Sequence, residues 1–205
     1  MTTESRQRSR EDVVTAAGRL FAERGFHGTS MRDLGSELGL LGSSLYSHVA
    51  GKQELLVEVV RRGAAMFQAL ADEVLAIDDT ATAQLRRLIR GHISIVIENL
   101  DQARTILNEA RFLPPEERTP ILEMRDRYES VYRSVVERGI DDGEFDRDLD
   151  PSMTAIHVLS LLNAIERWYR PQGHLTPDAI AGNLIRFVEG GLQSNSSQTT
   201  EGGVS

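Results

Sequence analysis

Residues 30–52 read SMRDLGSELGLLGSSLYSHVAGK, and this stretch decides the fold of the first quarter of the chain. Ser30 and Asp33 have the spacing of a capping box, which predicts a short amphipathic helix beginning after Ser30. Gly39 ends this helix, and a second short helix follows until Ala50-Gly51 breaks it. Two short helices joined by a tight turn predict a helix-turn-helix, although small helical bundles also contain such corners.

The second helix, at about residues 42–49, has the polarity of a binding surface. Leu45 and Val49 lie four positions apart and are expected to point inward. Its other side chains include short or planar hydrogen-bonding groups: Ser43, Ser44, Tyr46, Ser47 and His48. Small side chains let a helix lie deep in the major groove of DNA, where hydroxyl groups bond phosphates or base edges. The local pattern is equally typical of a polar turn exposed to solvent.

The single lysine of the chain follows directly. The 23 basic residues are 22 arginines and Lys52, which begins the next predicted helix. A lysine at a helix N-terminus opposes the helix dipole, which lowers the stability of the helix by roughly a few tenths of a kcal/mol. A phosphate bound between the helix amides and the ammonium group would offset this cost, so Lys52 is a candidate phosphate contact. The alternative is an ordinary surface lysine.

The charge distribution restricts a polyanionic partner to this region. The net charge is -8, which at first argues against nucleic acid. Residues 1–52, however, hold seven basic and six acidic side chains, for a charge of +1, and the remainder carries -9. The first quarter is therefore the part best suited to DNA, and the arginines at positions 6, 8 and 10 are expected to add nonspecific affinity.

Composition and motifs argue against an enzyme. The chain has no cysteine, which removes disulfides, thiolate metal sites and cysteine nucleophiles. It has neither a Glu-x-x-His motif of di-iron bundles nor a phosphate-binding Gly-x-x-x-x-Gly-Lys loop, so no metal or cofactor is expected. It has no apolar run of 18 residues and no secretory signal, so we expect a cytoplasmic protein without a membrane partner.

Helical periodicity dominates the rest of the chain and predicts an all-α fold. Besides the short pair, helices are predicted over residues 10–24, 52–77, 81–99, 101–112, 119–141, 151–170 and 177–190. Residues 193–205 consist largely of Ser, Thr, Gly, Asn and Gln and are expected to be disordered. The chain is thus divided into a domain at 1–52, a helical body at 53–192 and a tail.

From Val13 to Leu56 the sequence resembles the DNA-binding domain of TetR-family transcriptional regulators. The matching elements are A-x-x-L-F-A-E-R-G-F-x-G-T-S-M-R-D-L, then G-L-L-G-S-S-L-Y-S-H-V, then G-K-Q-E-L-L. The resemblance implies a three-helix head, a larger ligand-binding and dimerisation body, and about nine helices in all. By position, it implies DNA contacts from Ser30, Arg32, Ser43, Ser44, Tyr46, His48 and Lys52.

The resemblance implies a ligand-responsive repressor that a small effector releases from its operator. Residues 167–176 resemble the branch of the family that senses acyl-CoA thioesters, although they also suit helix capping and packing of Trp168. The effector is therefore expected to be a small apolar or acyl-CoA-type molecule. A helical scaffold or adaptor that binds no DNA is the alternative.

The body is expected to enclose an apolar pocket. Its predicted walls come from four helices: Phe67, Leu88, Ile95, Phe112, Tyr128 and Tyr132. Asn163 and Arg167 lie at i and i+4 of one predicted helix, so they should share a face. Arg167 would then meet an anionic headgroup.

The last two predicted helices present apolar stripes that suggest a homodimer. The stripes consist of Ile156, Leu159, Leu162 and Ile165 on one helix and Ile180, Leu184, Phe187 and Val188 on the other. Because a 205-residue monomer cannot cover both stripes and also close a pocket, a four-helix interface is expected. Two recognition helices related by a twofold axis predict a pseudo-palindromic site in double-stranded DNA.

Overall fold

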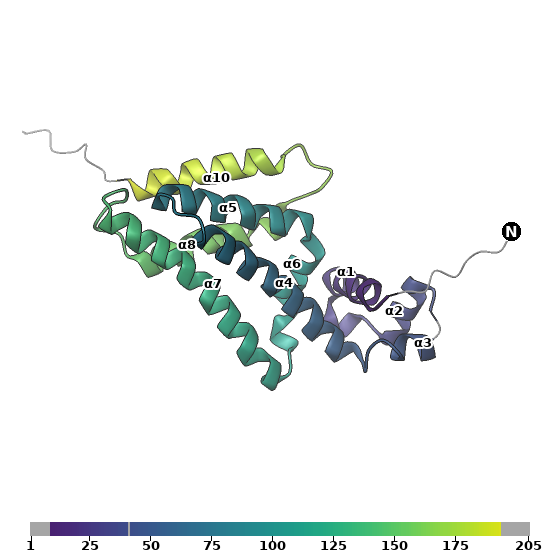
Figure 1. Ribbon diagram of the computed structural model, residues 1–205. Coiled ribbons are helices and arrows are strands. Elements are labelled where there is room, and N and C mark those ends of the chain that lie inside the picture. Colours follow the sequence, from purple (N-terminus) through teal and green to yellow (C-terminus); the bar gives the residue numbers. More distant parts are fainter. Residues whose placement is uncertain (1–8, 41, 194–205) are drawn as a thin grey trace, which may run out of the picture.

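The computed structural model describes residues 9–40 and 42–193, with the backbone alone at residues 42 and 43. These residues form helices and no strand, as predicted (Figure 1). The α-helices are α1 (Arg10–Gly28), α2 (Met31–Leu38), α3 (Gly42–Tyr46), α4 (Lys52–Leu75), α5 (Ala81–Glu98), α6 (Leu100–Glu109), α7 (Pro115–Asp141), α8 (Pro151–Asn163), α9 (Ile165–Trp168) and α10 (Pro177–Leu192). A 3-10 turn, η1 (Ala110–Phe112), follows α6.

The head consists of α1, α2 and α3 at one end of the molecule (Figure 1). The predicted capping box is present, because the Ser30 hydroxyl accepts from the Asp33 amide and the Asp33 carboxylate accepts from the Ser30 amide. Gly39 ends α2 in the left-handed conformation, with φ of 65°. The first helix was expected to end before Gly25. Instead, Gly25 is a kink with φ of 75°, after which one further turn reaches Gly28.

Helix α4 joins the head to the body, where it packs against α5, α6 and α7 (Figure 1). Two apolar cores lie along this helix. The head core takes residues of α4 as far as Val60 and also includes Leu113 and Ile121 from the body. The body core is built from α4, α5, α7, α8 and α10 around Tyr132 and Leu162. Because both cores share α4 and the head core includes body residues, a change in the body can reach the head.

Two helix boundaries differ from the prediction. Helix α7 begins at Pro115 rather than at 119, since a proline at the first position lacks an amide that would be unpaired in any case. The helix predicted over 151–170 ends at Asn163, and the four-residue α9 follows a break at Ala164. Residues 194–205 of the expected tail at 193–205, and the arginines at positions 6 and 8, lie outside the described residues.

Candidate functional site

The candidate DNA-binding surface lies on α2 and α3, at the end of the molecule remote from α10 (Figure 1). Leu45 and Val49 are buried in the head core, as their spacing predicted, and they anchor the segment. Tyr46 is 56% exposed, and Ser30 and Arg32 also lie at the surface. Tyr46 is therefore the large side chain that this segment presents outward.

The other predicted DNA contacts on α3 and the turn after it are less exposed than Tyr46 or lie outside the described side chains. Ser44 and His48 are half-buried, and the side chain of Ser43 lies outside the described residues. The recognition helix was expected to reach residue 49, but α3 ends at Tyr46 and a turn follows. The Ser30 hydroxyl is held by Asp33, and hydrogen bonds from Ser30 lower the pKa of that carboxyl.

Lys52 does not have the predicted environment. Its ammonium group donates to the carbonyls of Phe26, at 2.8 Å, and Thr29, at 2.9 Å, and lies 4.3 Å from the centroid of the Phe26 ring. Both carbonyls belong to the end of α1, where the backbone has unpaired acceptors. The lysine therefore fastens the end of α1 to the start of α4, instead of facing outward toward a phosphate.

The head and the body meet at α6 and η1, through buried polar contacts as well as apolar ones. The Glu109 carboxylate accepts from the Phe26 amide at 2.6 Å, and the Thr105 hydroxyl donates to the Gly18 carbonyl at 3.0 Å. The Gln53 amide donates to the Phe112 carbonyl at 2.7 Å. Phe112 stacks on Phe26 of the head, with ring centroids 5.9 Å apart. Phe112 was predicted to line the pocket, but it packs against the head.

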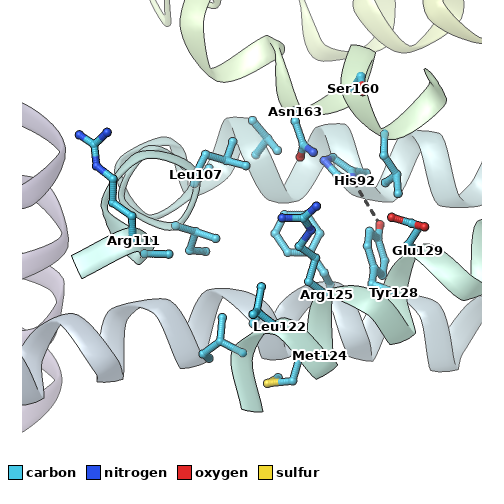
Figure 2. A pocket seen from close by; sticks show the side chains of 18 of the residues that line it. His92, Leu107, Arg111, Leu122, Met124, Arg125, Tyr128, Glu129, Ser160 and Asn163 are labelled. Atoms are coloured by element: carbon cyan, nitrogen blue, oxygen red, sulfur yellow. Dashed lines mark hydrogen bonds between the residues drawn. The ribbon is translucent and has the colours of Figure 1, made fainter. Parts of the chain in front are cut away.

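A cavity of about 530 Å³ lies in the body, between α4, α6, α7 and α8 (Figure 2). Its walls include the predicted Phe67, Tyr128 and Asn163. Leu88 and Tyr132 are instead buried in the body core and Ile95 is half-buried, and none of the three lines the cavity. The predicted pocket therefore exists, but α6 and the first half of α7 supply more of its wall than periodicity indicated.

Arg167 was expected in the pocket and lies outside it. A turn at Ala164, whose backbone keeps helical angles, separates α8 from α9, and the cavity wall includes Asn163 but not Arg167. The Arg167 side chain is 79% exposed, and its guanidinium lies 3.6 Å from Glu166. Asn163 remains at the pocket wall without it (Figure 2).

Charged side chains that the sequence analysis missed occupy the pocket wall on α7. Arg125 and Glu129 lie one turn apart on this helix and both line the cavity (Figure 2). No described residue pairs with the Arg125 guanidinium, whereas the Arg118 guanidinium donates to the carbonyls of Arg111 and Leu113. The i, i+3 and i+7 spacing of Arg125 with Tyr128 and Tyr132 was a signal that could have identified Arg125.

A chain of buried polar groups lies behind the apolar wall. His92 Nδ1 is 3.2 Å from the Tyr128 hydroxyl, which is 3.2 Å from the Tyr132 hydroxyl. Burial lowers the pKa of His92 to about 3, so the imidazole is neutral at physiological pH, and burial raises the pKa of both tyrosines. The three hydrogen-bonded side chains are therefore all neutral at physiological pH.

Comparison with known proteins agrees with this architecture. The family model of the tetracyclin repressor-like C-terminal domain matches residues 78–192, more than half of the chain, and the model of bacterial regulatory proteins of the tetR family matches residues 13–59. The chain belongs to the TetR family. It is a ligand-responsive, DNA-binding transcriptional regulator, and nothing favours the scaffold alternative.

Three proteins illustrate what this regulator is similar to. The HTH-type transcriptional repressor KstR2 of Rhodococcus jostii is 28% identical over 94% of this chain and 95% of its own length. The structure of the ketosteroid transcriptional regulator KstR2 of Mycobacterium tuberculosis has a TM-score of 0.86 at 26% identity, covering 94% of this chain and 97% of that one. AibR, solved with isovaleryl coenzyme A and operator DNA, has a TM-score of 0.79 at 26% identity, covering 87% and 96%.

The predicted dimer stripes of this TetR-family chain divide into inward and outward residues. Ile180, Val188 and Leu162 are buried in the chain's own core, so they cannot form an interface. Ile165 is also buried, Leu184 is partly buried against the core, and Leu159 lines the pocket. Phe187 is 69% exposed, and the exposed apolar residues of α8 are Met153, Ile156 and Leu161, of which Ile156 also lines the cavity. A shallow groove between α8 and α10 includes Leu161 and Phe187.

No group of three or more His, Asp or Glu side chains within residues 9–40 and 42–193 is placed to hold a metal ion. None of the helices described there is both long enough and apolar enough to cross a bilayer.

Proposed function

We propose that this regulator is a homodimeric repressor that an effector with an apolar body and an anionic end releases from a pseudo-palindromic operator. The observation that carries the proposal is the cavity of about 530 Å³, whose largely apolar wall includes Arg125, an exposed arginine that makes no ion pair or hydrogen bond with a described residue. A ligand site of this kind is usually apolar, with a few polar groups that orient the ligand. The resemblance to KstR2 and to AibR, which was solved with an acyl-CoA, supports the same class of effector.

Arg125 takes the role that the sequence analysis gave to Arg167. A guanidinium binds carboxylates and phosphates through paired, charge-assisted hydrogen bonds. Arg125 lies on the same helix as the buried Tyr128, so an acyl chain between α4 and α8 would place its charged end against α7 (Figure 2). A fatty acid and a CoA thioester share this chemistry.

The pocket is continuous with the contacts that hold the head. Ala110, Arg111 and Leu113 line the cavity, and they flank Phe112, whose carbonyl accepts from Gln53 at the start of α4. Glu109 holds the Phe26 amide one residue before this segment. A ligand that displaces η1 would therefore shift the head. Because a ligand shifts an equilibrium only through differential affinity, it must fit the displaced arrangement better than the one that binds DNA.

The outward apolar residues of α8 and α10 form the proposed dimer face. Phe187 and Leu161 line the groove, and Gly190 and Gly191 beside them have open space where a Cβ would lie. Small residues allow the helices of a second copy to approach closely. The dimer would present two copies of Tyr46 to successive major grooves, with Ser30, Arg32, Ser44 and His48 as the proposed supporting contacts.

The experiment begins with genome-wide recovery of bound DNA, which yields an operator. Complexes with this operator are then titrated with octanoyl-CoA, octanoate and a neutral hydrophobic dye. We expect octanoyl-CoA or octanoate to release the operator, and Arg125→Gln to raise the half-releasing concentration about tenfold, as loss of one charge-assisted contact implies. The matched control is Arg127→Gln, because Arg127 is exposed on α7 as Arg125 is but does not line the pocket. Release by the neutral dye alone, with Arg125→Gln unaffected, would leave a general sensor of hydrophobic compounds.

A further inference from the structure

We propose that His92 donates a hydrogen bond to a carbonyl oxygen of the effector, so that the pocket selects ligands with a keto or thioester group within an apolar skeleton. The inference rests on the proposed function and specifies the ligand class of the same site. Its observation is a buried imidazole at the pocket wall whose Nε2 has no hydrogen-bond partner among the described residues.

His92 is unusual for a purely structural side chain, because it is buried with one ring nitrogen unpaired. The residue is 2% exposed, and its ring packs on Phe67, with centroids 4.7 Å apart. A buried polar group without a partner is destabilising by about 1–3 kcal/mol. Nδ1 is turned toward Tyr128, and Asn163 lines the same cavity (Figure 2). His92 lines the cavity, and its unpaired Nε2 is buried there.

The positions of the hydrogens along the His92–Tyr128–Tyr132 contacts determine whether Nε2 is a donor or an acceptor. If Nδ1 carried the proton, His92 would donate to Tyr128, Tyr128 would donate to Tyr132, and the fully buried Tyr132 hydroxyl would have no acceptor. In the opposite order, Tyr132 donates to Tyr128 and Tyr128 donates to Nδ1. The second order leaves one unmatched group instead of two, and that group is the Nε2 N–H.

A neutral N–H donor in an apolar wall recognises an acceptor without requiring charge. A carbonyl oxygen satisfies this requirement, whereas a methylene group leaves the donor unpaired, and this difference is the usual source of strong discrimination. Nε2 is buried in the absence of a ligand, so the proposal requires a neighbouring side chain to move. Asn163 lines the same cavity, and its side chain makes no hydrogen bond with a described residue. The Asn163 amide then offers a second donor.

The test compares matched ligands that differ in the carbonyl. One pair is octanoyl-CoA and its thioether analogue S-octyl-CoA, and the other is 9-oxodecanoate and decanoate. Binding to the full-length protein is measured by calorimetry for the wild type, for His92→Phe and for the control His174→Phe, in an exposed loop. We expect about tenfold tighter binding of the carbonyl member in at least one pair, and loss of that preference in His92→Phe alone.

The two pairs separate the possible sources of the carbonyl. A preference confined to the CoA pair assigns the thioester, and one confined to the acid pair assigns a ketone on the skeleton. Equal binding within both pairs would overturn the inference and leave the proposed effector class standing. Failure of all four ligands to bind a protein that still binds its operator would overturn both.

A second measurement needs no ligand and no variant. Nitrogen-15 spectra of the imidazole in the intact protein at pH 7 should show the proton of His92 on Nε2. A proton on Nδ1 would contradict the hydrogen count, and with it the inference, even if His92→Phe failed to fold.

Discussion

The side chain of Lys52 connects two backbone segments that are far apart in the sequence. Its position at a helix N-terminus indicated a phosphate contact, because the helix dipole and the exposed amides could be read from the sequence. The end of α1, 23 residues earlier, could not be placed in the same way, since the kink at Gly25 directs the carbonyls of Phe26 and Thr29 toward the ammonium. The sequence singled out Lys52, but the carbonyls that its ammonium group binds could be identified only from the tertiary structure.

Lys52→Ala should therefore destabilise the head. Two charge-assisted hydrogen bonds to carbonyls are lost at a half-buried site, so we expect the free energy of unfolding to fall by about 1–3 kcal/mol. Urea unfolding monitored by circular dichroism measures this change. The salt dependence of operator binding should stay as steep as in the wild type, because no phosphate contact is removed. A salt slope lower by about one, at unchanged stability, would restore the phosphate assignment.

The buried His92 makes stability depend on pH in a predictable direction. Its pKa is about 3 in the folded protein, whereas an unfolded histidine has a pKa of about 6.5. Between these values the unfolded state binds the extra proton, so the contribution of His92 to stability is complete above pH 6.5 and is lost as the pH falls toward 3. The slope is about 1.4 kcal/mol per pH unit.

We expect the wild type to lose about 2 kcal/mol more than His92→Phe between pH 6.5 and pH 5. Urea unfolding at the two pH values checks this difference. His174→Phe is the matched control and should follow the wild type, because His174 is exposed. If His92→Phe has the same pH dependence as the wild type, the imidazole is not buried as described.

At the scale of elements, the sequence predicted which helices exist better than where they end. Capping signals were reliable where they were local, as at Ser30 and at Thr176, whose hydroxyl accepts from the Ala179 amide. No local signal marked the break at Ala164, where Glu166 is drawn into the body and Arg104 donates to its carbonyl at 3.3 Å. Helical spacing placed Arg167 near Asn163, but it could not show that the Arg167 side chain is exposed and that Arg125 of α7 lines the cavity instead.

The contact between α4 and η1 is expected to carry the ligand response to the head. Gln53→Ala removes the hydrogen bond to the Phe112 carbonyl and leaves the pocket lining intact. We expect operator affinity without effector to change less than threefold, whereas the release by octanoyl-CoA weakens. Fluorescence anisotropy with labelled operator measures both quantities. Gln68→Ala, on the same helix but bonded to Asp72, is the control and should release normally. Normal release from Gln53→Ala would show that the response takes another route.

At the scale of the whole molecule, the apolar stripe of α10 has two faces that periodicity alone could not distinguish. Ile180 and Val188 pack inward, whereas Phe187 points outward beside the exposed residues of α8. Phe187→Glu should therefore reduce the dimer to a monomer, because it places a charge at the centre of an apolar contact. Light scattering at micromolar concentration measures the mass, with circular dichroism to verify folding. A wild-type protein that is already monomeric would contradict the proposed interface.

The central claim is that the pocket and the head are thermodynamically linked. Linkage is reciprocal, so an effector that weakens operator binding must itself bind less tightly to the protein on its operator. The most direct measurement is the affinity for octanoyl-CoA of the free protein and of the protein saturated with operator DNA. The account predicts weaker binding in the complex by about 5–150-fold, matching the factor by which octanoyl-CoA lowers operator affinity. Equal affinity in the two states would contradict it.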